Sequence, residues 1–228
     1  MEKENKNNPL TFPETIVLLA LNDKGWFGNS ENRIRFGLAG AVLFKLEEER
    51  YIGITGNQVL ITGTKETGDK VLDTAMEVLR KSKKNMTLKS SVQRLVYKSG
   101  VKWKPIVKDL VKRNILKKEE YQLLRIFYQD KYPLENTEIK KQILRDLYEK
   151  IIGEKELSPE DLMLLAVMRT CKMIDKNFLL HEHFLKVRTK IREITEFREP
   201  LNESTAKVSA LQDAIRLAIL TSNVSLHV

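Results

Sequence analysis

The amino-acid sequence predicts a mainly α-helical, single-domain fold that carries two short β-hairpins. Apolar residues recur at helical spacing through most of the 228 residues. Cap sequences such as Thr11-Phe12-Pro13-Glu14 and the stretch from Ser158 stand where helices are expected to begin. Segments typical of strands are short and occur in two places, so the β content is expected to be small.

The N-terminal part is expected to form two helices and a hairpin. Thr11 can cap the first helix, which ends at the polar stretch Asn22 to Gly25. The second helix covers roughly residues 32–49, where apolar residues keep helical spacing. Two short apolar segments on either side of Gly56-Asn57 predict a hairpin. Its strands are residues 51–54 and 59–61.

The rest of the chain is expected to alternate helices with a second hairpin. Asn114 suits the end of a helix. The segment 115–133 that follows is rich in Leu, Ile, Phe and Tyr and predicts the hairpin. Gly153 ends one helix, and Ser158 with the proline after it opens another. The expected helices are residues 69–82, 88–97, 105–113, 136–152, the one that opens at Ser158, 180–197 and 204–222.

Composition predicts a protein with one domain and no membrane span. No linker, repeat or low-complexity tract interrupts the sequence, so we expect a flexible leader at residues 1–9 and one domain at residues 10–228. The leader lacks the apolar segment of a signal peptide. The apolar run Ile16 to Leu21 is far shorter than the about 20 residues that span a bilayer. Cys171 is the only cysteine, which fits a reducing, cytoplasmic setting.

Positive charge is concentrated in one segment. Between Arg80 and Lys118 there are fourteen Lys or Arg residues and a single acid, Asp109, whereas the whole chain has a net charge of +9. The remainder of the chain is therefore slightly acidic. A basic field of this kind attracts phosphate-bearing partners, either nucleic acid or anionic lipid headgroups. The alternative is a solvated face shared by two or three helices.

Two groups of apolar residues could contact a membrane. Trp26, in a loop with Phe27, could anchor at the bilayer boundary, or it could fold onto the first helix. The second group belongs to the second hairpin, where a strand cannot turn all of its apolar side chains to one core. Those on the other face would form a tip that enters the headgroup layer or supports self-association. The hairpin residues are Leu123, Leu124, Ile126 and Phe127.

No residues are arranged for catalysis, a metal or a cofactor. His181 and His183 stand two residues apart, so on a helix they would point about 200° from each other. Cys171 lies in an apolar helical segment and is expected to be a buried thiol. No phosphate-binding loop, dinucleotide fingerprint or hydrolase motif is present in the sequence. We therefore expect a binding protein rather than an enzyme, with no cofactor.

An ordered set of motifs resembles the Golgi phosphoprotein 3 family. It begins with Leu10-Thr11-Phe12-Pro13-Glu14 and Leu18 to Gly25, and continues with Gly37-Leu38-Ala39-Gly40-Ala41. Trp103-Lys104-Pro105 to Leu116, the second hairpin, Tyr132-Pro133-Leu134, the Leu162–Ala166 helix and the Asn177 region follow in the same order. The resemblance covers nearly the whole chain after residue 9.

The resemblance implies a compact helical fold with one projecting β-hairpin and a basic pocket for phosphatidylinositol 4-phosphate beside it. It also implies a peripheral membrane protein, at the Golgi in a eukaryote, that holds the cytosolic tails of membrane enzymes. The family's pocket Trp falls at Ser30 and one pocket Arg falls at Ala39, while its two further Arg positions fall near Gly100 and Trp103, so none of the four residues is matched. The candidate headgroup-binding residues around these positions are Trp26, Arg33, Arg35, Lys98, Lys102, Trp103 and Lys104.

These observations favour a peripheral, membrane-binding adaptor for anionic phospholipids or phosphoinositides. The adaptor could hold protein tails and could form a homo-oligomer through the hairpin. The alternative is a nucleic-acid-binding protein of winged-helix type, with residues 105–113 as the recognition helix and the hairpin as the wing. Few side chains on that helix can read base edges, which counts against the alternative.

Overall fold

A computed structural model describes most of the chain. The described residues are 9–27, 31–82, 86–98, 101–123, 127–178, 182–196 and 202–224, with the backbone alone at 123, 127, 128, 175, 176, 223 and 224. The leader expected at residues 1–9 lies outside the described residues, apart from Pro9.

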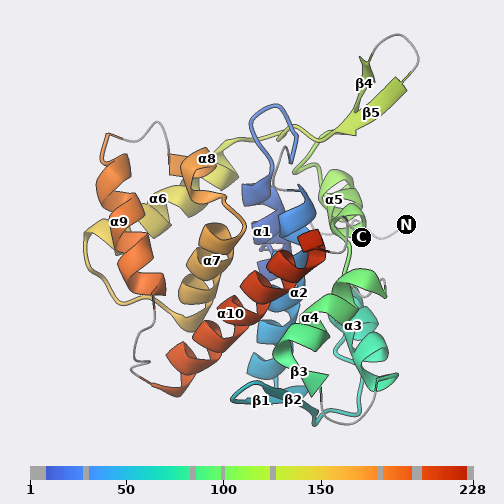
Figure 1. The fold of residues 1–228 in the computed structure, drawn as a ribbon. Coiled ribbons are helices and arrows are strands. Elements are labelled where there is room, and N and C mark those ends of the chain that lie inside the picture. The colour runs from blue at the N-terminus through green and yellow to red at the C-terminus, as the bar shows by residue number, and fades with distance from the viewer. Residues whose placement is uncertain are drawn as a thin grey trace.

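The prediction of a mainly helical fold with short hairpins is confirmed (Figure 1). The helices are α1 (Phe12–Ala20), α2 (Glu31–Glu48), α3 (Lys70–Arg80), α4 (Leu88–Tyr97), α5 (Trp103–Lys112), α6 (Glu138–Ile152), α7 (Pro159–Thr170), α8 (Ile174–Phe178), α9 (Phe184–Thr195) and α10 (Glu203–Val224). The strands are β1 (Ile52–Thr55), β2 (Gln58–Ile61), β3 (Met86–Thr87), β4 (Glu119–Leu123) and β5 (Phe127–Lys131).

The core is built around α1 and α2. Both carry apolar residues on most sides, and a helix of that kind must be covered all round by other elements. Helices α4, α7 and α10 pack against α2, and α10 crosses in front of it in Figure 1. A Cβ atom at Gly37 would lie 2.7 Å from Sγ of Cys171, and one at Gly40 would lie 2.3 Å from Ile215. Two glycines on α2 therefore allow α7 and α10 to approach it closely.

Local cap signals in the sequence set several helix ends as predicted. Thr11 and Glu14 form a capping box at the start of α1, and Ser158 and Asp161 form another at the start of α7. Asn114 follows α5 with a positive φ of 56°. In each case the cap exchanges hydrogen bonds within a few residues, so the signal is readable without tertiary contacts.

Three details differ from the prediction. The first hairpin gains a third strand, because β3 pairs antiparallel with β2 through Val59 and Met86. The helix expected at residues 180–197 is wrong in its first part, since Glu182 and His183 form a turn and α9 begins at Phe184. A separate short helix, α8, precedes that turn. His181 lies outside the described residues.

The β4–β5 hairpin projects from the helical body above α5 (Figure 1). Its antiparallel register pairs Glu119 with Lys131 and Tyr121 with Gln129. Ion pairs of 2.7 Å between Lys131 and Glu119 and 3.2 Å between Lys118 and Asp130 join the two sides of its base. The projecting hairpin implied by the family resemblance is therefore present.

Candidate functional site

The loop that carries Trp26 is closed by its own hydrogen bonds. The side-chain oxygen of Asn22 accepts hydrogen bonds from the backbone N–H of Lys24 at 3.0 Å and of Trp26 at 2.9 Å. The backbone N–H of Asn22 in turn donates to the carbonyl oxygen of Trp26 at 2.9 Å. An Asn side chain that bonds to the following backbone favours a tight turn. The loop therefore presents Trp26 at a defined position.

Gly25 docks this loop against the base of the β4–β5 hairpin. Its φ is +79°, which favours glycine. Its carbonyl oxygen accepts a hydrogen bond from the backbone N–H of Tyr132 at 3.0 Å. A Cβ atom at this position would lie 2.2 Å from the nitrogen of Pro133 and 2.3 Å from the carbonyl carbon of Tyr132. Both contacts are with backbone, so no side-chain rotation could relieve them.

Replacing Gly25 with Ala is expected to separate the loop from the hairpin. The matched control is Gly68→Ala, because Gly68 also has a positive φ, of 84°, yet a Cβ atom there has no neighbour within 4 Å. The control costs about 1–2 kcal/mol of backbone strain. Gly25→Ala adds the clash and should lower the melting temperature by at least about twice as much. Thermal unfolding of both variants checks this, and equal melting temperatures would show that the loop is not held by the close approach.

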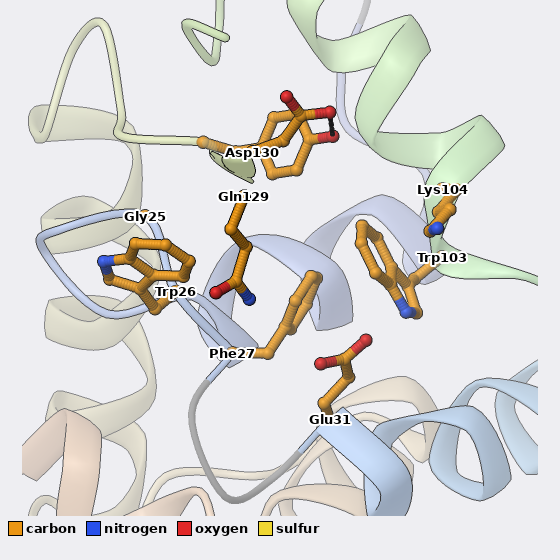
Figure 2. Close-up of a pocket in the computed structure, with 9 residues that line it drawn as sticks. Gly25, Trp26, Phe27, Glu31, Trp103, Lys104, Gln129 and Asp130 are labelled. Atoms are coloured by element: carbon orange, nitrogen blue, oxygen red, sulfur yellow. Dashed lines mark hydrogen bonds between the residues drawn. The ribbon is translucent and has the colours of Figure 1, made fainter. Parts of the chain in front are cut away.

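Between this loop, the start of α5 and the hairpin lies a pocket of about 440 Å³ with aromatic walls (Figure 2). The rings of Phe27 and Trp103 pack with centroids 4.5 Å apart, and Tyr132 meets Trp103 edge-on at 6.2 Å. Trp26 lies across the pocket from Trp103, with Phe27 and Gln129 between them. We call this the aromatic pocket. It is lined by Gly25, Trp26, Phe27, Glu31, Trp103, Lys104, Gln129, Asp130 and Tyr132.

The charges that line the aromatic pocket are mixed. Nζ of Lys104 stands 5.6 Å from the ring centroid of Trp103, within the range of a cation–π contact. Two carboxylates, Glu31 and Asp130, also line the pocket. Burial and the Asp130 carboxylate raise the pKa of Tyr132 to about 12, so its hydroxyl keeps its proton and bonds to Asp130 at 3.2 Å. The pocket is thus an aromatic hollow with one cation at its edge, rather than a cluster of arginines.

Helix α5 supplies positive charge beside the pocket. Its buried side consists of Ile106, Val107 and Leu110. Lys104, Lys108 and Lys112 follow one another at four-residue spacing, so they lie along one exposed side of the helix. Lys98 and Lys102 are exposed just before the helix, and the N-cap residue Lys102 makes no side-chain cap. Positive helix-dipole charge at this end adds to that of the lysines.

These five lysines, which we call the α5 lysine group, differ from Lys117 and Lys118 in having no acidic partner among the described residues. Lys117 pairs with Glu135 at 3.0 Å, and Lys118 pairs with Asp130. Within the described part of the chain, Lys98, Lys102, Lys104, Lys108 and Lys112 form no ion pair. Like charges four residues apart on a helix repel by about 0.2–0.5 kcal/mol per pair. An anionic partner would remove that repulsion.

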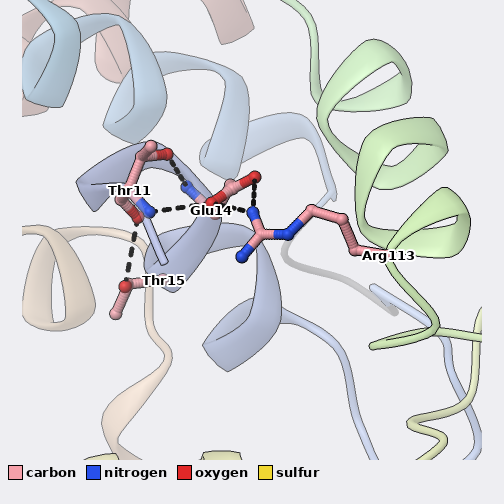
Figure 3. A network of polar contacts seen from close by, with 4 residues as sticks. All are labelled: Thr11, Glu14, Thr15 and Arg113. Atoms are coloured by element: carbon pink, nitrogen blue, oxygen red, sulfur yellow. Dashed lines mark hydrogen bonds and ion pairs between the residues drawn. The ribbon is translucent and has the colours of Figure 1, made fainter. Parts of the chain in front are cut away.

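A nearly buried ion pair anchors α5 to the first helix (Figure 3). Nη1 of Arg113 lies 2.8 Å and 2.9 Å from the two carboxylate oxygens of Glu14, and the two side chains are only 14% and 8% exposed. Glu14 also accepts a hydrogen bond from the backbone N–H of Thr11 at 2.7 Å. One carboxylate therefore caps α1 and fixes the C-terminal end of α5 against it.

The structure brings together only some of the candidate headgroup-binding residues. Trp26, Trp103 and Lys104 line the aromatic pocket, and Lys102 is the N-cap residue directly before Trp103. Lys98 is exposed at the C-cap of α4. Arg35 is directed to α4, where Nη2 donates to the carbonyl oxygen of Val96 at 3.4 Å. Arg33 lines a different hollow, next to α7 and α10.

Two of the family's four pocket positions lie among the described residues. Of the four positions named from the resemblance, Trp103 lines the aromatic pocket, whereas Ala39 is fully buried in the core. Ser30 and Gly100 lie outside the described residues. The structure therefore shows one of these positions at the pocket.

Two of the hairpin residues lie outside the described residues, namely Leu124 and Ile126. For Leu123 and Phe127 the backbone alone is described, and they are direct cross-strand partners at the end of the ladder. Their membrane or self-association role stays a prediction. Closer to the base, Trp26 meets Tyr121 of β4 edge-on, with centroids 5.8 Å apart. The Trp26 loop and the hairpin are therefore in contact.

Several pocket residues were not predicted from the sequence. Tyr132, Gln129 and Asp130 come from β5 and the residue after it, and Glu31 begins α2. The residues from β5 meet the Trp26 loop, which lies far from them in the sequence. Tyr132-Pro133 appears among the family motifs, which was the one available signal for this region. Nothing in the sequence around Glu31 and Asp130 indicated that these two acids would line the pocket.

The prediction that Cys171 is a buried thiol is confirmed. Cys171 is fully buried, and burial raises the pKa of its thiol to about 12. Across the part of the chain that the structure describes, no group of three or more His, Cys, Asp or Glu side chains could hold a metal ion. Within the same ranges, every helix is too short or too polar to cross a membrane.

Fold and site together define a mainly helical protein with a projecting hairpin, an aromatic loop docked at its base, and a group of lysines beside both. The model of the family described as Golgi phosphoprotein 3 (GPP34) matches residues 12–218. The chain therefore belongs to the Golgi phosphoprotein 3 family.

Proposed function

We propose that this protein is a peripheral membrane protein that binds anionic lipid headgroups with the α5 lysine group and the aromatic pocket. The observation that carries the proposal is the row Lys104, Lys108 and Lys112, which is exposed, forms no ion pair among the described residues and begins at the aromatic pocket with Lys104. Each Lys near an anionic membrane surface contributes about 1 kcal/mol, so several must act together. Family membership supports a role of this general kind.

The aromatic pocket and the hairpin would add apolar contact to this charge. Tryptophan and tyrosine favour the boundary between headgroups and acyl chains because their rings are amphipathic. We propose that the connection between β4 and β5, with Leu124 and Ile126, enters the same boundary. Strands β4 and β5 themselves project from the helical body (Figure 1).

Lysine supplies a point charge and not the planar fork of arginine, so recognition of one particular headgroup should be weak. We infer selection for negative surface charge in the first place, with phosphatidylinositol 4-phosphate as one such headgroup. We further propose a cytoplasmic, peripheral location, at the Golgi if the organism is eukaryotic, and a role in holding protein tails at the membrane. No reaction is proposed.

Binding to vesicles should weaken steeply as salt rises. Exposed charges are screened over about 10 Å at 0.1 M ionic strength, and the α5 lysines are exposed. We expect the protein to float with phosphatidylglycerol vesicles at low salt and to be largely released from them at physiological salt. It should not float with neutral phosphatidylcholine vesicles. The proposal would be contradicted by flotation that does not change with salt concentration, or by equal binding to neutral and anionic vesicles.

The same conditions test the nucleic-acid alternative. Helix α5 followed by a hairpin has the order of a winged helix, but its exposed basic side chains are lysines, which suit phosphate rather than base edges. A gel shift with duplex DNA at the salt used for flotation should show weaker binding than the vesicles do. Tight DNA binding without vesicle binding would favour the alternative.

A further inference from the structure

A second basic surface lies away from the aromatic pocket, where the end of α7 meets α2, α9 and α10. Two adjoining hollows, of about 570 and 520 Å³, share Arg169 and Lys172 in their walls. Neither shares a lining residue with the aromatic pocket. We call the two together the α7 basic cleft. Its cationic residues are Arg33, Arg169, Lys172, Arg188, Arg192 and Arg216.

Few acids offset this charge. The hollow between α7 and α9 is lined by Arg169, Lys172, Arg188 and Arg192, and no carboxylate stands among its described lining residues. The neighbouring hollow contains Glu196 and Asp213. Each of these is already engaged, Glu196 by Arg169 at 2.6 Å and Asp213 by Arg216 at 3.0 Å. Among the described residues that line the cleft, six cations stand against two carboxylates, so this lining carries a positive charge.

One arginine of the cleft is held in place by the protein itself. Nη1 of Arg169 donates to the hydroxyl of Thr195 at 3.0 Å, and Nη2 donates to Glu196. The Thr195 hydroxyl donates in turn to the carbonyl oxygen of Ile191 at 2.6 Å. The guanidinium is therefore fixed before any ligand arrives. Fixing a binding group in advance lowers the entropy lost on binding.

Other cations of the cleft remain available. Among the described residues, the side chains of Lys172 and Arg192 have no hydrogen-bond or ion-pair partner, and both are exposed. Lys172 also has a positive φ of 58° just after α7, a position that favours glycine or asparagine. A lysine there comes at a conformational cost, and it places one more cation in the cleft.

We propose that the α7 basic cleft binds a ligand that carries a phosphomonoester or polyphosphate group. Arginine presents paired N–H groups that match phosphate oxygens, and several cations around one hollow suit a group with more than one negative charge. The ligand could be a free phosphorylated compound or a lipid headgroup, since both offer the same group. This inference does not rest on the membrane role of α5.

The test uses inorganic tripolyphosphate as the probe, at constant ionic strength, with the full chain. The cleft variant is Lys172→Glu with Arg192→Glu, because neither side chain supports the fold through a described contact. The control of equal charge change is Lys65→Glu with Lys70→Glu, because both side chains are exposed and neither lines the cleft or the aromatic pocket. We expect tripolyphosphate to raise the melting temperature of the parent and of this control. The cleft variant should bind it at least about tenfold more weakly in calorimetry.

Two results would overturn the proposal, namely no binding of tripolyphosphate by the parent, or equal binding by the parent and a folded cleft variant. A second arm identifies the source of the phosphate. Tripolyphosphate that displaces the parent and the control from phosphatidic acid vesicles, but not the cleft variant, supports a lipid phosphomonoester in the cleft. Binding of tripolyphosphate without such competition supports a free phosphorylated ligand.

Discussion

Changing Lys104, Lys108 and Lys112 together to Glu is expected to abolish binding to anionic vesicles while the fold persists. The three side chains are exposed on one side of α5, and the buried side of that helix is untouched. Three attractions of about 1 kcal/mol each are lost and three repulsions appear, so affinity should fall by at least about 100-fold. Vesicle co-sedimentation at low salt measures the loss, and thermal unfolding checks the fold.

The matched control changes Lys141, Lys155 and Lys186 to Glu. These residues are also exposed, and they belong to or follow α6 and α9, on the far side of the molecule from α5 in Figure 1. Net charge changes equally in both variants, so a general charge effect would weaken both. We expect the control to lose far less affinity. Equal losses of affinity in the two variants would show that binding depends on the net charge of the protein and not on α5.

Replacing Arg113 with Leu should produce the largest loss of stability. The change leaves the Glu14 carboxylate nearly buried without its charged partner, 8% exposed and still joined to Thr11 (Figure 3). Removing one partner of a buried ion pair costs about 3–5 kcal/mol. For a chain of this size we expect the melting temperature to fall by roughly 6–15 °C. Thermal unfolding measures the change.

Two comparison variants show whether the uncompensated charge is the cause. Lys112→Leu alters the adjacent residue, which is exposed, and should shift the melting temperature little. Adding Glu14→Gln to Arg113→Leu should recover part of the stability, because an amide is less costly to bury than a carboxylate. A double variant that is less stable than Arg113→Leu alone would mean that packing, and not charge, explains the loss.

The elements that the sequence predicted best are those with local signals. The Thr11 and Ser158 capping boxes and the positive φ of Asn114 depend on residues within one turn. Strand β3 was missed because a strand of two residues is too short to show an alternating apolar pattern. Its pairing with β2 is a tertiary contact that the sequence does not reveal. The turn at Glu182 and His183 was missed because apolar residues continue on both sides of it.

Part of the candidate site was predicted from the sequence and part was not. Trp26, Trp103 and Lys104 stood out by residue type and by the family motifs, and they meet in one pocket. Asp130 belongs to the hairpin on which Gly25 docks and Glu31 begins α2, and sequence spacing does not reveal that the two line one pocket. Arg33 was placed with the lipid-binding candidates because it lies between the family pocket positions Ser30 and Ala39 in sequence, but α2 directs it to the α7 basic cleft.

Intrinsic tryptophan fluorescence tests most directly whether the aromatic pocket and α5 face the membrane. The chain contains two tryptophans, Trp26 and Trp103, and both line the pocket and are half-buried. All tryptophan emission therefore reports on this one surface. We expect anionic vesicles at low salt to protect the emission from acrylamide quenching, and neutral vesicles to leave the quenching unchanged. A protein that floats with anionic vesicles while acrylamide quenches it as it does the free chain would show that another face meets the membrane.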